Sequence, residues 1–379
     1  MQKRIRIVSV GIVLVILLIG IIIYYNNSNN KYSFTQDGIR YALTLDGNKI
    51  TSFPSKGMYK AQVTCVGADG RWLYDEWKLA IENITSDDVT CDIKFETIPK
   101  TNLNDYIISL LESEQGIGRV VNENGYRYEG KNPNNYIWFN NEYWRIIGVF
   151  DSASHGQNGK NLVKIIRSET LDGFAWHKSN TNDWTASSLK SLLNGAYYNA
   201  QDGTSSGYCY GYSTTATANC DYTKRGIQSG YRGMIANVTW YLGGYSSASA
   251  TAESFYGYER GTTVYSGRPT TTTGYIGLMY PSDYGYSVLS SSCARTTNLS
   301  SYNTATCAGQ SWLYGKGYEW TLTPRSSYSY YVFFLNNGGN LSSNYAHIGY
   351  GSRPVLYLDA SVYKIDGDGS LENPYIVGM

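Results

Sequence analysis

The six cysteines of this chain fall into three sequence-local pairs, Cys65 with Cys91, Cys209 with Cys220, and Cys293 with Cys307. None has the C-x-x-C spacing of a metal-binding knuckle or a redox dithiol, so the spacing predicts three disulfides. Other connectivities exist for six cysteines, and the nearest-neighbour pairing rests on its regularity along the chain. Buried free thiols are the alternative, which an oxidising compartment disfavours.

The N-terminus predicts that the chain is exported. An almost unbroken apolar run from Ile7 to Tyr25 follows basic residues and has about the length that crosses a bilayer as a helix. A secretory signal peptide has a shorter apolar core and ends in small residues, whereas the polar residues Asn26 to Asn30 follow this run. We therefore expect residues 1–30 to form a cytoplasmic basic tip and an uncleaved, single-pass transmembrane anchor (residues 7–25) in the cell membrane, with extracellular C-terminal domains.

Composition excludes one class of partner and favours one kind of secondary structure. The net charge is +1 and only 16% of residues are charged, so no basic surface is available to bind nucleic acid. The 38 tyrosines and 40 glycines, against 8 prolines, favour twisted sheets and turns over a helical bundle. The roughly 350 residues after the anchor predict two domains. No cofactor is expected.

Residues 31–98 have the pattern of a small antiparallel β-sandwich. Short alternating runs, such as Tyr59 to Cys65, are separated by turn residues. A bridge from Cys65 to Cys91 would staple this sheet. Trp72 and Trp77 are expected to fill its core, since isolated aromatic residues are more often buried than ligand platforms.

A helix and linker (residues 99–127) and a second domain (residues 128–379) are predicted next. In the second domain, Tyr136 to Phe139 and Tyr143 to Phe150 are strand-like and flank the dipeptide Asn140-Asn141. Such a pair of runs around a two-residue turn predicts a β-hairpin.

Two helices and a long irregular region follow in the second domain. One helix is predicted between Thr185, a candidate N-terminal cap, and Gly195, a candidate C-terminal stop, because the leucines in between share one helical face. A further helix is predicted over Gly233 to Leu242. From about Ala196 to Tyr318 the chain is rich in Tyr, Gly, Ser and Thr and carries two of the cysteine pairs. Long structureless loops are uncommon in compact domains, so disulfide-pinned insertions are predicted.

Catalytic and metal-binding patterns are hard to find in this sequence. His155, His177 and His347 are not spaced as metal ligands with other His, Cys or carboxylate residues. Carboxylates such as Glu142 and Glu259 have no second carboxylate placed by a motif, as a glycan hydrolase would require. We therefore expect no catalytic residues, no metal and no enzymatic activity.

The segment from Asp366 to Glu372 has oxygen-bearing side chains at alternate positions, like the start of a calcium loop. It lacks the rest of that pattern and any flanking helix signal. A plain turn before the last strand is favoured, and calcium binding stays the alternative.

The C-terminal segment from Trp320 to Leu358 has the composition of a recognition surface. Two apolar runs, Tyr331 to Leu335 and Pro354 to Leu358, bracket a tract of Tyr, Asn, Ser and Gly. Tyrosine supplies contact area at low entropic cost, and the small polar residues supply adaptable hydrogen bonds. A polar loop between two ordinary strands is the alternative. The predicted ligand-binding residues are Arg325, Tyr328, Tyr330, Tyr331, Asn336, Asn337, Asn340, Asn344, Tyr345, His347 and Tyr350.

Several stretches of the second domain resemble a known family: IWFNNEYWRIIGVF, TASSLKSLLNGAYYN, YERGTTVYSGRPTTTTGYIGLMYPSDYGYSV, and YEWTLTP followed by GSRPVLYL. They are similar to a family of uncharacterised exported surface proteins of Firmicutes-like bacteria with a C-type-lectin-like domain. That domain also resembles the variable proteins of diversity-generating retroelements. The resemblance covers about Tyr128 to Val377 and implies a small sheet with long loop-rich insertions and a C-terminal ligand face. Related sulfatase-modifying enzymes depend on cysteines in their active region, and the tract from Trp320 to Tyr350 has none.

Together these features predict an α+β protein with an N-terminal transmembrane helix, a small antiparallel β-sandwich and a C-type-lectin-like α+β domain with long loop-rich insertions. The predicted function is that of a membrane-anchored extracellular binding protein with a protein or glycan ligand. A structural or adhesive pilus-like component and a glycan-active hydrolase are the alternatives. The oligomeric state is not predicted.

Overall fold

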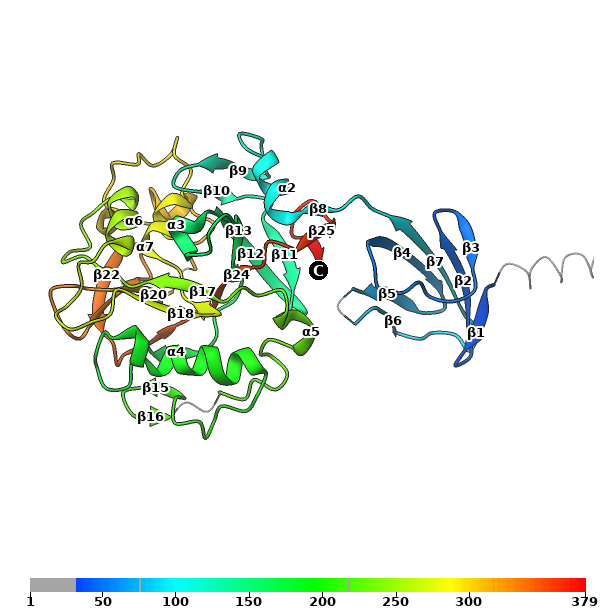
Figure 1. Cartoon of the computed structure of the whole chain (residues 1–379), viewed down its shortest axis with the longest axis horizontal. Coiled ribbons are helices and arrows are strands. Elements are labelled where there is room, and N and C mark those ends of the chain that lie inside the picture. Colours follow the sequence, from blue (N-terminus) through cyan, green and yellow to red (C-terminus); the bar gives the residue numbers. More distant parts are fainter. Residues whose placement is uncertain (1–31, 75, 217–218, 316) are drawn as a thin grey trace, which may run out of the picture. The chain divides into compact units, whose positions relative to one another are not determined.

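The computed structural model describes residues 32–379 except residues 75, 217–218 and 316. These residues form two compact units that divide between Pro99 and Lys100 (Figure 1). The predicted membrane anchor, residues 7–25, lies outside the described residues. Within the described part of the chain, no helix combines the length and apolar character needed to cross a membrane.

The protein is mostly β, which corrects the predicted α+β class. Strand residues (38%) far outnumber helix residues (15%). The helices are short, and α6 (Ala252–Arg260) has only 9 residues. The sequence between the strands is rich in glycine, serine and threonine and lacks the long amphipathic runs from which a helical layer is built.

The small unit consists of one sheet and one separate hairpin. The sheet has the order β1-β2-β7-β4 with β3 paired to β2, and β5 pairs with β6. β2 and β7 run parallel, so the unit is not the purely antiparallel sandwich that was predicted. The long segment of chain between β2 and β7 provides the crossover connection that two parallel strands need. The strands are β1 (Phe34–Gln36), β2 (Ile39–Leu45), β3 (Asn48–Ile50), β4 (Tyr59–Val66), β5 (Asp69–Leu73), β6 (Lys78–Glu82) and β7 (Val89–Thr97).

The core of the small unit forms around a cross-strand disulfide. Cys65 on β4 lies directly opposite Cys91 on β7, with their Cα atoms 4.1 Å apart, and the two are bridged. Trp72 is buried, as predicted, and its ring meets that of the half-buried Trp77 edge-on at 5.3 Å. The predicted Cys65–Cys91 disulfide and the predicted aromatic core are confirmed.

The large unit is organised around a ten-stranded sheet. Its path is β19-β24-β13-β12-β11-β26-β25-β8, with β10 paired to β12 and β9 paired to β10. Most residues of β12 and β13 are buried, so these central strands form the core of the unit. The strands are β8 (Thr101–Asn102), β9 (Ile117–Asn122), β10 (Tyr126–Asn132), β11 (Tyr136–Phe139), β12 (Glu142–Phe150), β13 (Leu162–Arg167), β19 (Ile276–Gly277), β24 (Val355–Leu358), β25 (Tyr363–Asp366) and β26 (Tyr375–Gly378).

A second, five-stranded sheet carries the C-terminal tract. Its order is β14-β23-β20-β21-β22, so β22 is an edge strand. Two-stranded ribbons, β15 with β16 and β17 with β18, complete the β-structure of the described residues. The strands are β14 (Gly173–Ala175), β15 (Tyr210–Tyr212), β16 (Thr215–Ala216), β17 (Val238–Tyr241), β18 (Thr271–Gly274), β20 (Glu319–Pro324), β21 (Tyr331–Leu335), β22 (Leu341–Tyr345) and β23 (Gly349–Gly351).

The predicted β11–β12 hairpin is confirmed. Asn140 and Asn141 connect the strands and have φ angles of 58° and 60°. Both central residues of the favoured two-residue hairpin turn require positive φ, which asparagine tolerates. The dipeptide therefore fixes the register of the strands on either side.

The helices differ from prediction in two places. Ser187, rather than Thr185, caps α4, and helical turns continue past Gly195 to Tyr197, where the tyrosine is fully buried. The segment predicted as a helix over Gly233 to Leu242 contains strand β17, which pairs with β18. The helices are α2 (Leu103–Ser109), α3 (Ser152–His155), α4 (Ser188–Leu192), α5 (Ser229–Arg232), α6 (Ala252–Arg260) and α7 (Pro281–Tyr286).

Candidate functional site

Strands β21 and β22 form the hairpin that carries most of the predicted ligand-binding residues. They pair antiparallel, with Tyr331 opposite Tyr345 at one end and Leu335 opposite Leu341 at the other. Residues Val332 to Leu335 are buried, which fixes β21 in the core. The end of the hairpin at Tyr331 and Tyr345 is the more exposed one.

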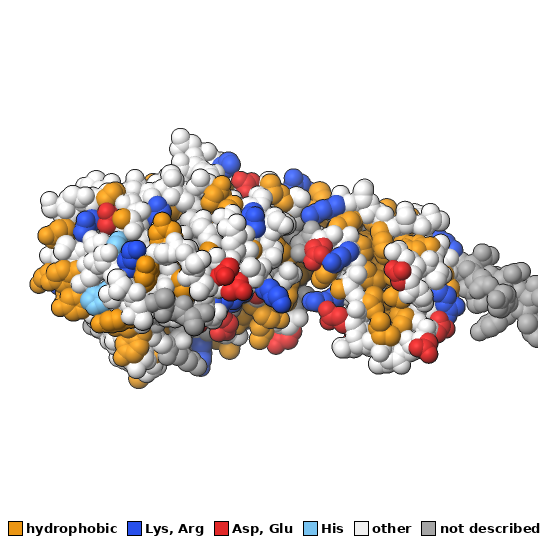
Figure 2. Space-filling view, turned by 90° about the horizontal axis from the view of Figure 1, so that it is seen from below, with side chains coloured by type: hydrophobic (Ala, Val, Ile, Leu, Met, Phe, Trp, Pro, Cys, Tyr) orange, Lys and Arg blue, Asp and Glu red, His pale blue; other side chains and the backbone are white. Residues whose placement is uncertain are grey.

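Five tyrosines and one histidine gather at this exposed end and form what we call the tyrosine patch: Tyr212, Tyr328, Tyr330, Tyr331, Tyr345 and His347. Ring centroids are 5.2 Å apart for Tyr328 and Tyr331, and 4.9 Å apart for Tyr331 and Tyr345. The His347 ring lies 5.6 Å from Tyr345 and 5.3 Å from Tyr212. Tyr212, Tyr328 and Tyr345 remain 51%, 40% and 40% exposed. Figure 2 shows orange side chains around pale-blue histidines at the end of the large unit that carries β22.

The loop between β20 and β21 is held in place by a buried amide. Asn182 is 1% exposed, and its Nδ2 donates to the carbonyl oxygens of Arg325, Tyr328 and Tyr331 at 2.9, 2.7 and 3.1 Å. Asn182 Oδ1 accepts from Arg268 Nε at 3.3 Å. Neither residue was predicted, because the contact joins segments far apart in the sequence.

Arg325 lies beside the tyrosine patch. Its Nη1 donates to Ser343 Oγ at 3.1 Å and its Nε donates to the carbonyl oxygen of Ser246 at 2.7 Å. The guanidinium carbon lies 4.9 Å from the centroid of the Tyr328 ring, within range of a cation–π interaction. Arg325 thus adds a positive charge to the border of an aromatic surface.

The predicted asparagines do not join the tyrosine patch. Asn336, Asn337 and Asn340 lie in the turn at the opposite end of the β21–β22 hairpin. Asn336 Oδ1 accepts from the backbone nitrogens of Gly338 and Asn340, so this side chain shapes the turn. Asn344 Nδ2 donates to the Tyr350 hydroxyl at 2.6 Å.

Tyr350 belongs to a separate aromatic group. Its ring lies 4.7 Å from Trp320, 4.7 Å from Phe334 and 5.2 Å from Tyr318. Phe334 alternates with Tyr331 and Phe333 along β21, so this group packs on the other face of the strand. The structure therefore divides the predicted residues among the patch, a turn and a second aromatic group.

The loop closed by Cys209 and Cys220 contributes to the tyrosine patch. The disulfide is formed, and the loop carries Tyr212 to the His347 ring. The backbone nitrogen of Ser213 donates to the carbonyl oxygen of His347 at 2.7 Å. Tyr212 was missed because it lies far from the hairpin in the sequence and reaches it through the Cys209–Cys220 loop.

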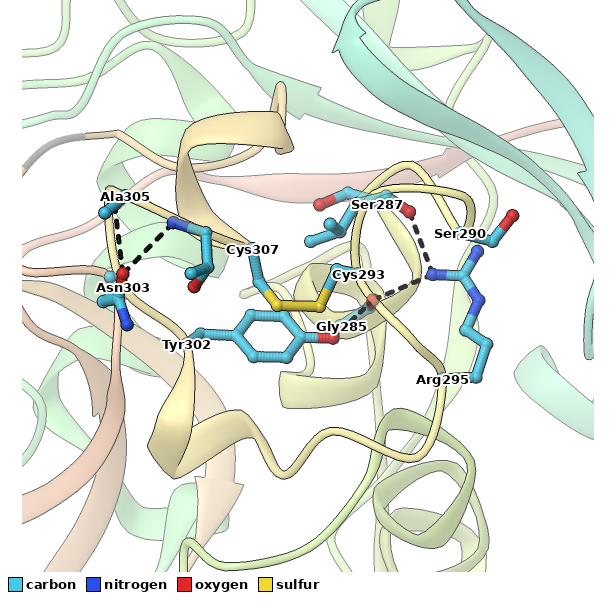
Figure 3. Close-up of a disulfide and its surroundings, with 12 residues drawn as sticks. Gly285, Ser287, Ser290, Cys293, Arg295, Tyr302, Asn303, Ala305 and Cys307 are labelled. Carbon is cyan, nitrogen blue, oxygen red and sulfur yellow. Dashed lines mark hydrogen bonds between the residues drawn. A yellow bond between two sulfur atoms is a disulfide. The ribbon is translucent and has the colours of Figure 1, made fainter.

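The loop closed by Cys293 and Cys307 supports the other end of the hairpin. Figure 3 shows this disulfide beside the Tyr302 ring, whose hydroxyl donates to the carbonyl oxygen of Gly285 at 3.2 Å. Within the loop, the carbonyl oxygen of Ser300 accepts from Asn340 Nδ2 at 2.9 Å. The two predicted disulfides of the large unit therefore lie on either side of the C-terminal hairpin.

A groove of about 790 Å³ on the β11–β12 hairpin is a second candidate site that the sequence did not reveal. Its volume is in the range of small-molecule sites. Five segments of the chain line it, and arginine and glutamate side chains accompany the aromatic ones: Tyr136, Trp138, Asn141, Glu142, Tyr143, Arg145, Arg167, Ser168, Glu169, Trp312, Tyr314, Gly315, Arg353 and Leu371. No residue of the tyrosine patch is among them.

The ionisable groups considered for catalysis have structural partners. Glu142 pairs with Arg167 at 2.7 Å. Glu259 is fully buried and accepts from the backbone nitrogen of Ser282 at 2.9 Å, and burial raises its pKa to about 7.

Among the described residues, no cluster of three or more His, Cys, Asp or Glu side chains is arranged to hold a metal ion. In the Asp366 to Glu372 segment, Asp368 Oδ1 accepts from the backbone nitrogen of Ser370 at 2.9 Å and shapes a turn before β26.

Comparison with protein-family models, curated proteins and solved structures finds no match for this chain.

Proposed function

We propose that this chain is an extracellular binding protein that contacts a protein ligand through the tyrosine patch. The three disulfides indicate an oxidising, extracellular environment. The observation that carries the proposal is the continuous contact among five tyrosines and His347 on an exposed part of the molecule. Tyrosine-rich surfaces offer large, amphipathic contact area with little loss of side-chain entropy on binding.

The support beneath the patch favours binding over a merely polar loop. Asn182 fixes the backbone of the loop that bears Tyr328, and β21 is anchored in the core. The Cys209–Cys220 loop holds Tyr212 against His347. Such preorganisation lowers the entropic cost of association. Of the two expected ligand classes, we favour a protein surface, because exposed tyrosines such as Tyr212, Tyr328 and Tyr345 are enriched at protein–protein interfaces.

The proposal is tested with the double variant Tyr328→Ser/Tyr345→Ser. We expect the full chain to bind at least one protein on an array of purified extracellular proteins. The double variant should weaken that binding by at least about tenfold, since central tyrosines of an interface commonly contribute at this level. Ile117→Ser, which removes another exposed apolar side chain of the same unit (61% exposed), should leave binding unchanged.

Two results would count against this function. If the double variant binds the protein as tightly as the wild type does, the tyrosine patch is not the binding surface. Self-association of the wild-type chain in sedimentation experiments, abolished by the same two substitutions, would instead support the structural or adhesive component considered from the sequence.

The resemblance to retroelement variable proteins extends the proposal to a diversified patch. In such proteins the variable positions near the C-terminus carry mixtures of residues that include Tyr and His, and the C-terminal tract of this chain has these residue types at Tyr328, Tyr330, Tyr331, Tyr345 and His347. A reverse transcriptase gene and a near-identical repeat of the codons for Trp320 to Leu358 in the neighbouring DNA would support it. Their absence would restrict the proposal to a binding protein of fixed sequence.

A further inference from the structure

The alternation of side chains along β11 and β12 determines which residues form the floor of the groove on this hairpin. Tyr136 pairs with Arg145, and Trp138 pairs with Tyr143, so these four side chains share one face of the hairpin. The Trp138 and Tyr143 rings meet edge to face at 5.0 Å, and Tyr143 is 38% exposed. Residues on the opposite face, such as Trp144, are buried in the core. The hairpin therefore presents a fixed row of flat aromatic surfaces to the groove.

Arg145 differs from the other buried arginines of the described residues. Arg127 and Arg353 are 1% and 5% exposed, and each pairs with a carboxylate: Asp283 at 3.1 Å and Glu319 at 2.6 Å. Arg145 is 8% exposed, and within the described part of the chain no carboxylate forms an ion pair with it. A buried charge without a counter-charge is costly.

Neutral groups hold the Arg145 guanidinium in place. Its Nε donates to Asn135 Oδ1 at 2.6 Å, Nη1 to the Tyr136 hydroxyl at 3.1 Å, and Nη2 to the carbonyl oxygen of Pro133 at 3.2 Å. The guanidinium carbon lies 3.9 Å from the Tyr136 ring centroid and 4.8 Å from that of Trp312. Burial lowers the pKa of Arg145 to about 10, so it still carries its charge at neutral pH.

We infer that this groove binds an acidic oligosaccharide, whose carboxylate pairs with Arg145 and whose sugar rings pack on Trp138 and Tyr143. The planar guanidinium fits a carboxylate, which would supply the missing counter-charge. Flat aromatic rings offer apolar surface to the C–H faces of sugars.

An acidic peptide fits the groove less well. An extended peptide commonly binds by adding a strand to a free sheet edge. β11 is paired on both sides, with β12 and with β26, so the floor of the groove offers no such edge. The inference concerns residues outside the tyrosine patch and does not depend on the proposed protein ligand.

Isothermal titration calorimetry with the full chain tests the inference. The probes are hyaluronan tetrasaccharide and tetragalacturonate as acidic sugars, chitotetraose as the neutral sugar and tetraglutamate as the acidic peptide. We expect at least one acidic sugar to bind at least about tenfold more tightly than chitotetraose and tetraglutamate. Arg145→Gln should abolish the preference for the acidic sugar. Lys160→Gln, which removes an equal charge at an exposed position outside the groove, should retain it.

A second variant covers the case in which Arg145→Gln fails to fold. Tyr143→Ala changes an exposed side chain, so we expect the variant to keep the wild-type thermal unfolding curve. Its affinity for the acidic sugar should fall by about tenfold or more. Equal affinities for acidic and neutral sugars, tighter binding of tetraglutamate, unchanged affinity in Tyr143→Ala, or no binding of any probe would overturn the inference.

Discussion

The side-chain amide of Asn182 donates from Nδ2 to the carbonyl oxygen of Tyr328 at 2.7 Å, although 146 residues separate the two positions. The same nitrogen also reaches the carbonyl oxygens of Arg325 and Tyr331. A single buried side chain thus sets the backbone of the loop that presents the tyrosine patch. The position of the patch therefore depends on this contact as well as on the hairpin.

Asn182→Ala should lower the free energy of unfolding by about 2–3 kcal/mol, because it removes the side-chain donor from the partly buried carbonyl groups of Arg325 and Tyr328. Urea denaturation measures this change. Hydrogen exchange should rise in residues 325–331, where the loop loses its anchor. Asn337→Ala, at an exposed position in the hairpin turn, is the matched control and should change neither quantity. Unchanged exchange in the loop of the Asn182 variant would contradict the anchoring role.

The Cys293–Cys307 disulfide should stabilise the large unit and order the Asn336 to Asn340 turn. The two cysteines are 14 residues apart, and closing a loop of this size contributes about 3 kcal/mol in the chain-entropy model. Cys293→Ser/Cys307→Ser should lose about this much stability and increase hydrogen exchange in the turn, through the contact of Asn340 with Ser300.

The disulfide of the small unit provides the control for that experiment. Cys65→Ser/Cys91→Ser removes a bridge within the other compact unit. It should leave hydrogen exchange in the Asn336 to Asn340 turn unchanged. If both double variants increase exchange there equally, the effect does not come from the Cys293–Cys307 loop.

Local sequence signals predicted the parts of the fold that depend on neighbouring residues. Each cysteine pairs with its nearest partner, and Asn140-Asn141 forms the hairpin turn, because a short loop closes these contacts. The C-terminal composition singled out tyrosines that do meet in one patch. It also included Asn336 and Asn340, whose polar side chains serve the turn.

The parts that the sequence did not reveal depend on long-range contacts. Asn182 lies in no motif and acquires its role only when the β20–β21 loop folds over it. The groove combines Trp138 with Trp312, which no local pattern connects. Gly195 resembles a helix stop, yet the burial of Leu193 and Tyr197 carries the helix onward. Tertiary packing overrides local preference at each of these positions.

Glu259 should make the stability of the large unit depend on pH. Burial raises its pKa from 4.5 to about 7, although Arg260 and Ser282 favour the carboxylate. Because the folded pKa exceeds the unfolded one, the native state binds more protons between these values. The contribution of Glu259 to stability is therefore full below about pH 4.5 and is lost as the pH rises to about 7.

Glu259→Gln should flatten this pH dependence relative to the wild type. Urea midpoints at about pH 4.5, 6 and 7.5 span the window in which the proton is lost. Glu253→Gln, at an exposed position on the same helix, should keep the wild-type slope. A wild-type slope in the Glu259 variant would assign the pH dependence to other groups.

Gly339 should be the least replaceable residue of the β21–β22 turn. Its φ angle is 93°, and a Cβ atom there would lie 2.2 Å from the Cβ atom of Ala308. Gly339→Ala should lower the free energy of unfolding by about 1–3 kcal/mol through backbone strain and by about as much again through overpacking. Adding Ala308→Gly should recover only the overpacking part, since it leaves the φ angle unchanged. Urea denaturation of the four proteins in this cycle separates the two contributions. Full recovery in the double variant would show that steric overlap alone excludes a side chain here.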